Sequence, residues 1–263
     1  MARLSLHDVT ICAAASVNVA ATVRALESCL DQINFADCLL FGAGGYSTAD
    51  ARIRVIDGPT LLSAADYSNF ILHRLGDHVE TSHALIVQWD GFVLDAAHWD
   101  PRFLECDYIG AAWPQFDDGH DVGNGGFSLR SRRLMDACQH PQFVGGHPED
   151  VAICRTNRAL LELQGIRFAD RALADLFSFE RTKPPGPTFG FHGIFNMIPA
   201  LGADRFWELY CCLDDRKTAL VDYRLLMKQL GSGRNVLGRR ARLTRDVLRL
   251  LLQLGRQGTD QAT

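Results

Sequence analysis

Hydrophobic and polar residues follow two different rhythms in the first hundred residues of this chain. Short, nearly continuous apolar runs are typical of buried strands, whereas apolar residues at every third or fourth position are typical of one helix face. The predicted strands lie within 8–16, 36–44, 51–59 and 83–95. The predicted helices cover 19–33 and 63–79, the second beginning after a Ser63 cap. Strands alternating with helices predict βαβ units, and hence an α/β fold with a mostly parallel sheet flanked by helices.

The second half of the chain has a different pattern. Residues 107–126 are rich in glycine, aspartate and aromatic residues, which predicts a long loop lining a site. Three prolines and three glycines within 181–193 predict a second structured loop. Helical spacing is found in 128–139, 149–164, 170–180, 203–213 and 222–231. The chain is therefore predicted to consist of an α/β domain, 1–200, and a helical C-terminal extension, 201–263.

Composition narrows the class of protein. The chain has 263 residues, of which 47% are hydrophobic and 22% charged, as in a globular protein with a substantial core. The net charge of −4 gives no reason to expect nucleic acid as a partner. No apolar run is long enough for a membrane span or a signal peptide, so a cytoplasmic protein is expected.

The eight cysteines contain no CxxC pair and fall mostly inside apolar segments. Free cysteine behaves as a small buried hydrophobe in a reducing compartment. The spacing therefore predicts buried thiols rather than disulfides or a zinc site.

One segment is strongly basic. Residues 234–256 carry seven arginines and a single acid, Asp246, and their leucines and valine gather on one predicted helical face. That face is formed by Leu243, Val247, Leu250, Leu251 and Leu254, with Arg245, Arg249 and Arg256 opposite. The segment is either an amphipathic helix packed on the domain or a contact with an anionic membrane surface, and we favour the membrane.

Asp90 follows a predicted buried strand, at the edge of a parallel sheet where ligands bind in such folds. A carboxylate there can hold a divalent cation that neutralises phosphate. It can equally be a turn aspartate that hydrogen-bonds the backbone beside Gly91. Both interpretations remain open from this stretch alone.

The glycine-rich turn at 123–126 can bring backbone amides close to a ligand, because glycine has no side chain. The polar residues that follow it are expected to cap and coat a surface helix. They are Ser128, Arg130, Arg132 and Arg133.

Glu149 and Asp150 follow Pro148 at the start of a predicted helix. Proline and acids are both favoured there, which is a sufficient structural explanation. The functional alternative makes one carboxylate a general base and leaves the other to bind a hydroxyl or orient the site. His192 lies in the second predicted loop, as an ordinary loop histidine or as a partner of Asp90 in a metal site.

Five blocks of sequence, taken in order, resemble a family of GT-A-type glycosyltransferase-like domains long catalogued as of unknown function. The blocks are LIVQWDGFVL, DYIGAAWP, VGNGGFSLRSRR, HPEDVAICR and PTFGFHG, within about residues 8–195. The resemblance implies a Rossmann-like sheet and a nucleotide-sugar donor. A looser likeness is to the β-1,4-galactosyltransferases, which share a strand-end metal aspartate, a GG-x-S turn, an ED pair opening a helix and a later metal-binding histidine.

The resemblance also implies roles for individual residues. Asp90 and His192 would bind Mn²⁺ or Mg²⁺, with Asp90 beside the donor, although the family's DxD pattern is reduced here to Asp-Gly-Phe. Asp150 would be the general base and Glu149 its acidic partner. The residues implied to contact donor or acceptor are Asn124, Gly125, Gly126 and Ser128, with Trp113 stacking on a sugar ring.

The implied reaction is inverting, metal-assisted hexosyl transfer in polysaccharide biosynthesis. The donor would be a nucleotide sugar, with a UDP-sugar favoured, and the acceptor a hydroxyl of a glycan or of a lipid-linked molecule at the inner face of the membrane. The reduced DxD supports a different class, a non-catalytic nucleotide-sugar-binding or scaffolding domain. A nucleotidyltransferase would require a strongly basic phosphate-binding loop near the first strand, which CAAASVNVAA (12–21) does not provide.

Overall fold

The computed structural model describes residues 3–42 and 44–260, with side chains described as far as residue 253. The chain forms two compact units, Met1–His192 and Gly193–Thr263. The predicted division after residue 200, into a catalytic domain and an extension, stays a prediction.

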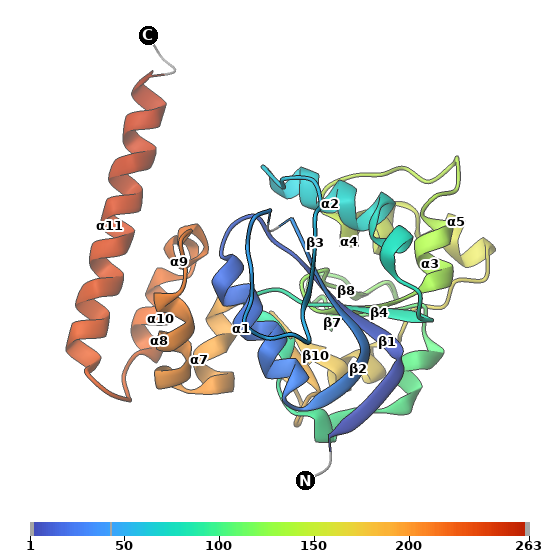
Figure 1. Ribbon diagram of the computed structural model, residues 1–263, viewed down its shortest axis with the longest axis horizontal. Coiled ribbons are helices and arrows are strands. Elements are labelled where there is room, and N and C mark those ends of the chain that lie inside the picture. The colour runs from blue at the N-terminus through green and yellow to red at the C-terminus, as the bar shows by residue number, and fades with distance from the viewer. Residues whose placement is uncertain (1–2, 43, 261–263) are drawn as a thin grey trace. The chain divides into compact units, whose positions relative to one another are not determined.

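The first unit is built on a six-stranded sheet with the order β3-β2-β1-β4-β9-β6 (Figure 1). The first four strands in this order run parallel, whereas β9 is antiparallel to both of its neighbours, β4 and β6. The strands are β1 (Leu4–Ala14), β2 (Ile33–Phe41), β3 (Arg54–Ile56), β4 (His83–Ile86), β6 (Tyr108–Ile109) and β9 (Ser128–Ser131). The predicted α/β class with a mostly parallel sheet is confirmed.

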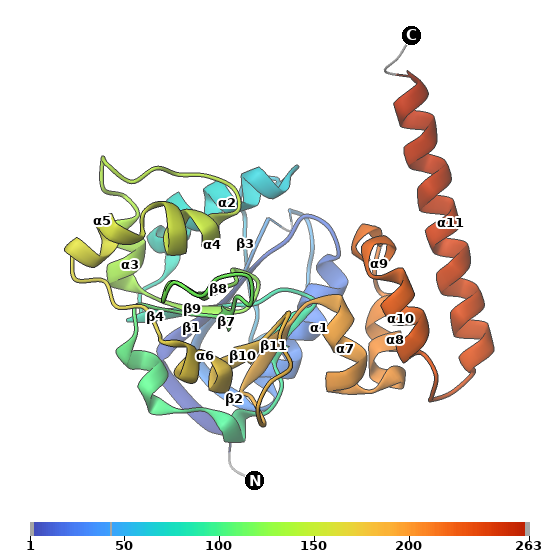
Figure 2. The ribbon, with the colours of Figure 1, turned by 180° about the vertical axis from the view of Figure 1, so that it is seen from behind.

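Helices cover the sheet because their apolar faces meet alternate residues of the strands. Helix α1 (Val19–Leu30) packs against β2, and α2 (Ala64–His73) begins where Ser63 Oγ accepts a hydrogen bond from the amide of Asp66, as predicted. Leu39 and Phe41, two residues apart on β2, belong to one buried cluster with Phe70 of α2. In both Figure 1 and Figure 2, α2 lies in one group with three later helices of the same unit. These are α3 (Arg132–Ala137), α4 (Glu149–Val151) and α5 (Arg158–Leu163).

Two small sheets and a further helix complete the unit. Strand β10 (Ser178–Phe179) follows α6 (Arg171–Phe177), runs parallel to β11 (Gly190–His192), and β11 is antiparallel to β5 (Gly91–Val93). Strand β7 (Ala111–Ala112) pairs with β8 (Val122–Gly123) inside the predicted long loop. One turn of π-helix, Ala152–Thr156, joins α4 to α5.

The predicted helix at 128–139 is wrong in its first part, because residues 128–131 form β9 and the helix begins only after Ser131. Strand β9 lies between β4 and β6, and its pairing with both overrides the local helical spacing. As a result Ser128 and Arg130 are buried rather than spread over a helix surface. The second predicted loop likewise contains β11, since the backbone of 190–192 pairs with β5.

The direction in which strands are added to the sheet changes at β1. After β1 the chain builds β2 and β3 on one side, and β4 then returns to the other side of β1. The loops that follow β1 and β4 therefore diverge at this switch point, which is where open α/β sheets bind ligands. Residues 87–91 follow β4 directly, so Asp90 lies at this edge of the sheet, as predicted.

The second unit is helical. It contains α7 (Ile194–Leu201), α8 (Ala203–Cys211), α9 (Lys217–Val221), α10 (Tyr223–Gln229) and α11 (Val236–Asp260). Within the described part of the chain, no helix combines the length and apolar character that crossing a bilayer requires. All eight cysteines are free, and five are buried as predicted, but Cys211 and Cys212 are exposed and Cys106 is half-buried.

Candidate active site

The backbone after β4 turns back sharply at Asp90. The amide of Gln88 donates to the carbonyl of Gly91 (2.9 Å) and the amide of Gly91 to the carbonyl of Gln88 (3.1 Å), so Trp89 and Asp90 form a two-residue hairpin turn. The returning strand β5 pairs with β11 in a register that sets Gly91 opposite His192. Asp90 is 7% exposed, and its Oδ1 lies 3.9 Å from His192 Nε2. The sheet thus brings together two predicted site residues about a hundred positions apart.

The ring of His192 is held on several sides. Its Nδ1 lies 3.3 Å from Glu180 Oε1, and its Nε2 lies 3.4 Å from Gln88 Oε1. A Cβ on Gly126 would come within 2.0 Å of Nε2, and one on Gly91 within 2.6 Å of Cδ2. Both positions must therefore be glycine for the ring to lie where it does.

The charges around His192 decide its protonation. Burial lowers the pKa of His192, but hydrogen bonding with Glu180 and the negative charge of Asp90 outweigh it, so the pKa is raised overall. Burial raises the pKa of the Glu180 carboxyl, but its hydrogen bond with His192 outweighs burial, so this pKa is lowered overall. The two groups therefore favour an ion pair when no other cation is near.

The glycine-rich turn links this pair to the acidic pair. The amide of Gly125 donates to Asp150 Oδ2 (3.0 Å), and the amide of Gly126 donates to Asn124 Oδ1 (3.0 Å). Asn124 has a positive φ of 71° and is 3% exposed, and its Nδ2 has no hydrogen-bond partner among the described residues. A buried donor without a protein hydrogen-bond partner is suited to binding a ligand atom or an ordered water.

Asp150 is partly buried, and this changes its acidity. Burial raises the pKa of its carboxyl, and the nearby charge of Glu149 raises it further, against the hydrogen bonds from the amides of Gly125 and Val151. A carboxyl with a raised pKa is a stronger base when it is ionised, as general-base catalysis requires.

Glu149 has a different environment. It forms an ion pair with Arg130 at 3.2 Å, and the two side chains are 6% and 2% exposed. Ser68 of α2 donates a hydrogen bond to Glu149 Oε2 at 3.0 Å. A Cβ on Gly125 would lie 2.0 Å from Glu149 Oε1, so the buried carboxylate packs directly against the glycine turn.

Ser128 and Trp113 also lie beside this turn, but both are buried. Ser128 Oγ donates to the carbonyl of Gly125 (3.4 Å) and accepts from Arg130 Nε (3.1 Å). Trp113 is 6% exposed, and its ring lies so close to Gly123 that a Cβ there would be 2.1 Å away. Little of the indole face is left for a sugar ring.

The donor atoms of Asp90 and His192 are close enough to reach one divalent cation. Two ligands on bonds of about 2.1 Å can lie at most about 4.2 Å apart, and Asp90 Oδ1 and His192 Nε2 are 3.9 Å apart. Metal-binding histidines usually orient their second nitrogen on a carboxylate, and Glu180 occupies that place. The described residues contain no cluster of three His, Cys, Asp or Glu side chains placed to hold a metal. Other ligands would therefore have to be phosphate oxygens and water.

Four residues of this region are not among the predicted site residues. Glu180 and Gln88 contact His192, and Ser68 and Arg130 hold Glu149. No local pattern marks Glu180, Ser68 or Arg130, since each depends on a partner distant in sequence. Gln88 had a usable signal, because it lies two residues before Asp90 at the same strand end.

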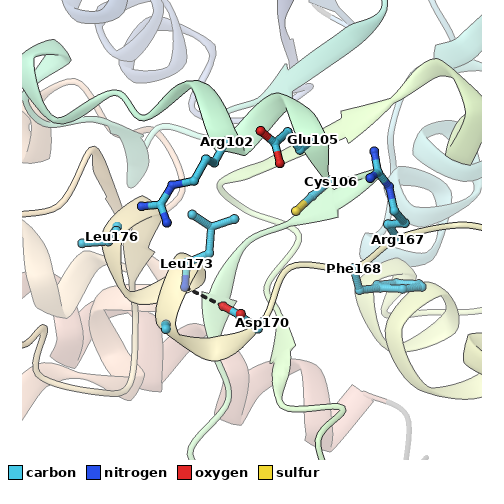
Figure 3. Close-up of a pocket in the computed structure, with 9 residues that line it drawn as sticks. Arg102, Glu105, Cys106, Arg167, Phe168, Asp170, Leu173 and Leu176 are labelled. Carbon is cyan, nitrogen blue, oxygen red and sulfur yellow. Dashed lines mark hydrogen bonds between the residues drawn. The ribbon is translucent and has the colours of Figure 1, made fainter.

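A separate cavity of about 420 Å³ contains none of the predicted site residues (Figure 3). It lies where the chain enters β6, and hence at the sheet edge opposite the carboxyl end of β4. Its polar groups have structural roles, because Asp170 caps α6 through the amide of Leu173 and Arg102 pairs with Asp100. It is lined by Arg102, Glu105, Cys106, Arg167, Phe168, Asp170, Ala172, Leu173 and Leu176.

The model of a family described as "Protein of unknown function (DUF5672)" matches residues 50–192. None of the curated proteins matches the chain.

Similar solved structures are glycosyltransferases. The galactosyltransferase LgtC, in complex with donor and acceptor sugar analogues, is 17% identical, with 79% of this chain and 97% of that chain covered and a TM-score of 0.48. A glycosyltransferase involved in glycosylating the major capsid of PBCV-1 is 11% identical (77% and 98% covered, TM-score 0.42). The mannosyltransferase PcManGT from Pyrobaculum calidifontis, in complex with GDP-Man and Mn²⁺, is 11% identical (98% and 81% covered, TM-score 0.43). With TM-scores below 0.5, nothing about the function of this chain follows from these likenesses.

Proposed function

This chain belongs to the family described as "Protein of unknown function (DUF5672)", and we propose that it transfers a sugar from a nucleotide-sugar donor to a hydroxyl of a glycan or lipid-linked acceptor. One observation carries the proposal. The amide of Gly125 binds Asp150, while the adjacent Gly126 lies against the ring of His192, which faces Asp90. A candidate base and a candidate cation-binding pair are thus held on neighbouring residues at the ligand-binding edge of the sheet.

Asp90 and His192 would hold Mn²⁺ or Mg²⁺, with Glu180 orienting the histidine. When bound, the cation neutralises the charge that develops on the leaving nucleoside diphosphate. The nucleotide we favour is uridine diphosphate.

Asp150 would act as the general base. The acceptor oxygen attacks the anomeric carbon and forms the new C–O bond, the bond from that carbon to the diphosphate oxygen breaks, and the acceptor proton passes to the Asp150 carboxylate. Attack opposite the leaving group inverts the configuration. General-base catalysis contributes about 10²–10⁴-fold to the rate, and the raised pKa of Asp150 suits that role.

The other predicted site residues would position this machinery. Glu149, paired with Arg130 and packed on Gly125, would keep the glycine turn in place rather than touch substrate. Ser128 would support the same turn, because its hydroxyl donates a hydrogen bond to the carbonyl of Gly125. Asn124 is the residue we propose for direct contact with donor or acceptor, because its buried amide nitrogen is not used by the described residues.

A non-catalytic nucleotide-sugar-binding or scaffolding domain is the second candidate. It is favoured by Phe92, which stands where the outer aspartate of a DxD pattern would be. Phe92 is 2% exposed and packs against the ring of Phe191 at 5.0 Å, so this position supplies no ligand.

Thermal unfolding with UDP, GDP, CMP and dTDP, each with and without Mn²⁺, is the first test. A ligand at a hundredfold excess over its Kd adds about 2.7 kcal/mol to stability. We expect a Mn²⁺-dependent rise in Tm with one nucleotide, lost in Asp90→Ala and His192→Ala but retained in the surface control Asp136→Ala. Sugar transfer from the matching nucleotide sugar then separates the candidates, because Asp150→Asn should bind the nucleotide but turn over about 10²–10⁴-fold more slowly. Nucleotide binding without transfer by the wild type supports the scaffold, and no binding at all refutes both.

A further inference from the structure

Helix α11 carries two apolar faces, and only one of them is used inside the second unit. Leu243 and Val247 are buried, 0% and 6% exposed, and the helix packs against α9 and α10 (Figures 1 and 2). Two polar contacts also join the helix to the rest of the second unit, since Tyr223 Oη lies 2.8 Å from Thr244 Oγ1 and Tyr210 donates to Asp246 at 3.1 Å. The expected apolar face is therefore an internal packing face at Leu243 and Val247, but the prediction is wrong for Leu251, which is 50% exposed. Leu254, predicted on the apolar face, and Arg256, predicted opposite it, lie outside the described side chains.

A second set of leucines lies on the outer side of the helix. Leu237, Leu248, Leu251 and Leu252 are 82%, 55%, 50% and 67% exposed. At about 100° per residue these four leucines fall within an arc of about 100°, and they extend over roughly 22 Å along the axis. Leucines of a helix in a soluble protein usually face inward, so an exposed row of leucines indicates an interaction surface.

The charged residues beside this row of leucines indicate the chemistry of the partner. Arg245 and Arg249 are exposed and follow the stripe on one side, at about 20–60° beyond its edge. The single acid of 234–256, Asp246, lies on the inner side, where it is 14% exposed and within 4 Å of Arg216 (3.7 Å) and Arg242 (3.9 Å). The outer side of the described helix is therefore apolar and cationic with no carboxylate to oppose it.

We propose that this outer face of α11 (Leu237, Leu248, Leu251 and Leu252 with Arg245 and Arg249) binds the surface of an anionic lipid bilayer. The leucines would enter the boundary between headgroups and acyl chains, and the arginines would contact lipid phosphates. The helix would lie in the plane of the membrane surface. The inference goes beyond sugar transfer, and its test needs no turnover.

The test is co-sedimentation of the full chain with vesicles of phosphatidylcholine alone and of phosphatidylcholine with 30% phosphatidylglycerol. We expect binding to the anionic vesicles only, weakened by added salt. Removing both arginines (R245Q/R249Q) should lower the partition coefficient about fivefold for each arginine. The L248S/L252S variant should lower it about tenfold or more for each leucine.

The control is Leu163→Ser, which removes a leucine that is 88% exposed on α5 in the first unit and should leave vesicle binding unchanged. All variants replace exposed side chains, so their Tm should equal that of the wild type. Equal binding to neutral vesicles, or wild-type binding by L248S/L252S, would overturn the proposal. So would a wild-type dimer in solution that L248S/L252S converts to monomer, because the face would then join two copies. Transfer to a water-soluble acceptor is unaffected by this outcome and tests the proposed function separately.

Discussion

The buried pair of Arg130 and Glu149 gives the sharpest test of how the site is held. The two charges are 3.2 Å apart and almost fully enclosed, at 2% and 6% exposure. With an effective dielectric constant of about 20, their attraction is about 5 kcal/mol. Removing one partner leaves the other charge buried, which typically costs about 3–5 kcal/mol. Glu149→Gln keeps the shape of the side chain and removes only its charge, so it should lower the free energy of unfolding by about that amount.

The measurement is urea unfolding of Glu149→Gln, Arg130→Met and the double variant. Because the double variant leaves no lone charge in the core, it should be more stable than the sum of the single effects predicts, by at least about 2 kcal/mol. Asp107→Asn is a matched control, a buried carboxylate that interacts with Ser131 and Arg133 and not with Arg130. If the two single effects add to within about 0.5 kcal/mol, the pair is not coupled and the reasoning fails.

Four further outcomes follow from the same geometry. Asp150→Asn should lower kcat by about 10²–10⁴-fold with nucleotide affinity unchanged in isothermal titration calorimetry. Because burial raises the pKa of Asp150, this base becomes protonated at a higher pH than an ordinary aspartate. In a pH–rate profile, kcat/KM of the wild type should therefore fall on acidification, with an inflection above the pKa of a free aspartate. Gly126→Ala places a methyl group 2.0 Å from His192 Nε2 and should abolish Mn²⁺-dependent stabilisation in thermal unfolding, at a cost of about 1–3 kcal/mol in stability. Glu180→Gln should weaken Mn²⁺ binding about 10–100-fold in metal titrations, and an undiminished affinity would remove Glu180 from the site.

Local sequence determined much of the framework. The positions of β1, α1, β2 and α2 follow from apolar periodicity, and the start of α2 follows from Ser63, whose hydroxyl caps the helix in the structure. The mostly parallel sheet follows from strands alternating with helices. Asp90 is correctly placed at a strand end for the same reason, since a residue next to a buried strand must lie at the edge of the sheet.

Only tertiary structure decided which charged residues are internal. Arg130 is predicted on a helix surface, because residues 128–139 have helical spacing. It is buried because β9 inserts between β4 and β6 and because Glu149 neutralises it from a different part of the chain. The contacts of His192 with Glu180 and Gln88 depend in the same way on the register of β11 against β5.

Helix α11 shows the same division. Its composition alone predicts a basic amphipathic helix, but periodicity does not say which of two apolar stripes the neighbouring helices cover. In the structure the stripe with Leu243 and Val247 is covered and the stripe with Leu248 and Leu252 is exposed. Short-range patterns determine where elements begin and which residues share a face, because those depend on backbone geometry. Which faces and charges meet depends on chain segments far apart in sequence, and for those only the folded structure supplies the partner.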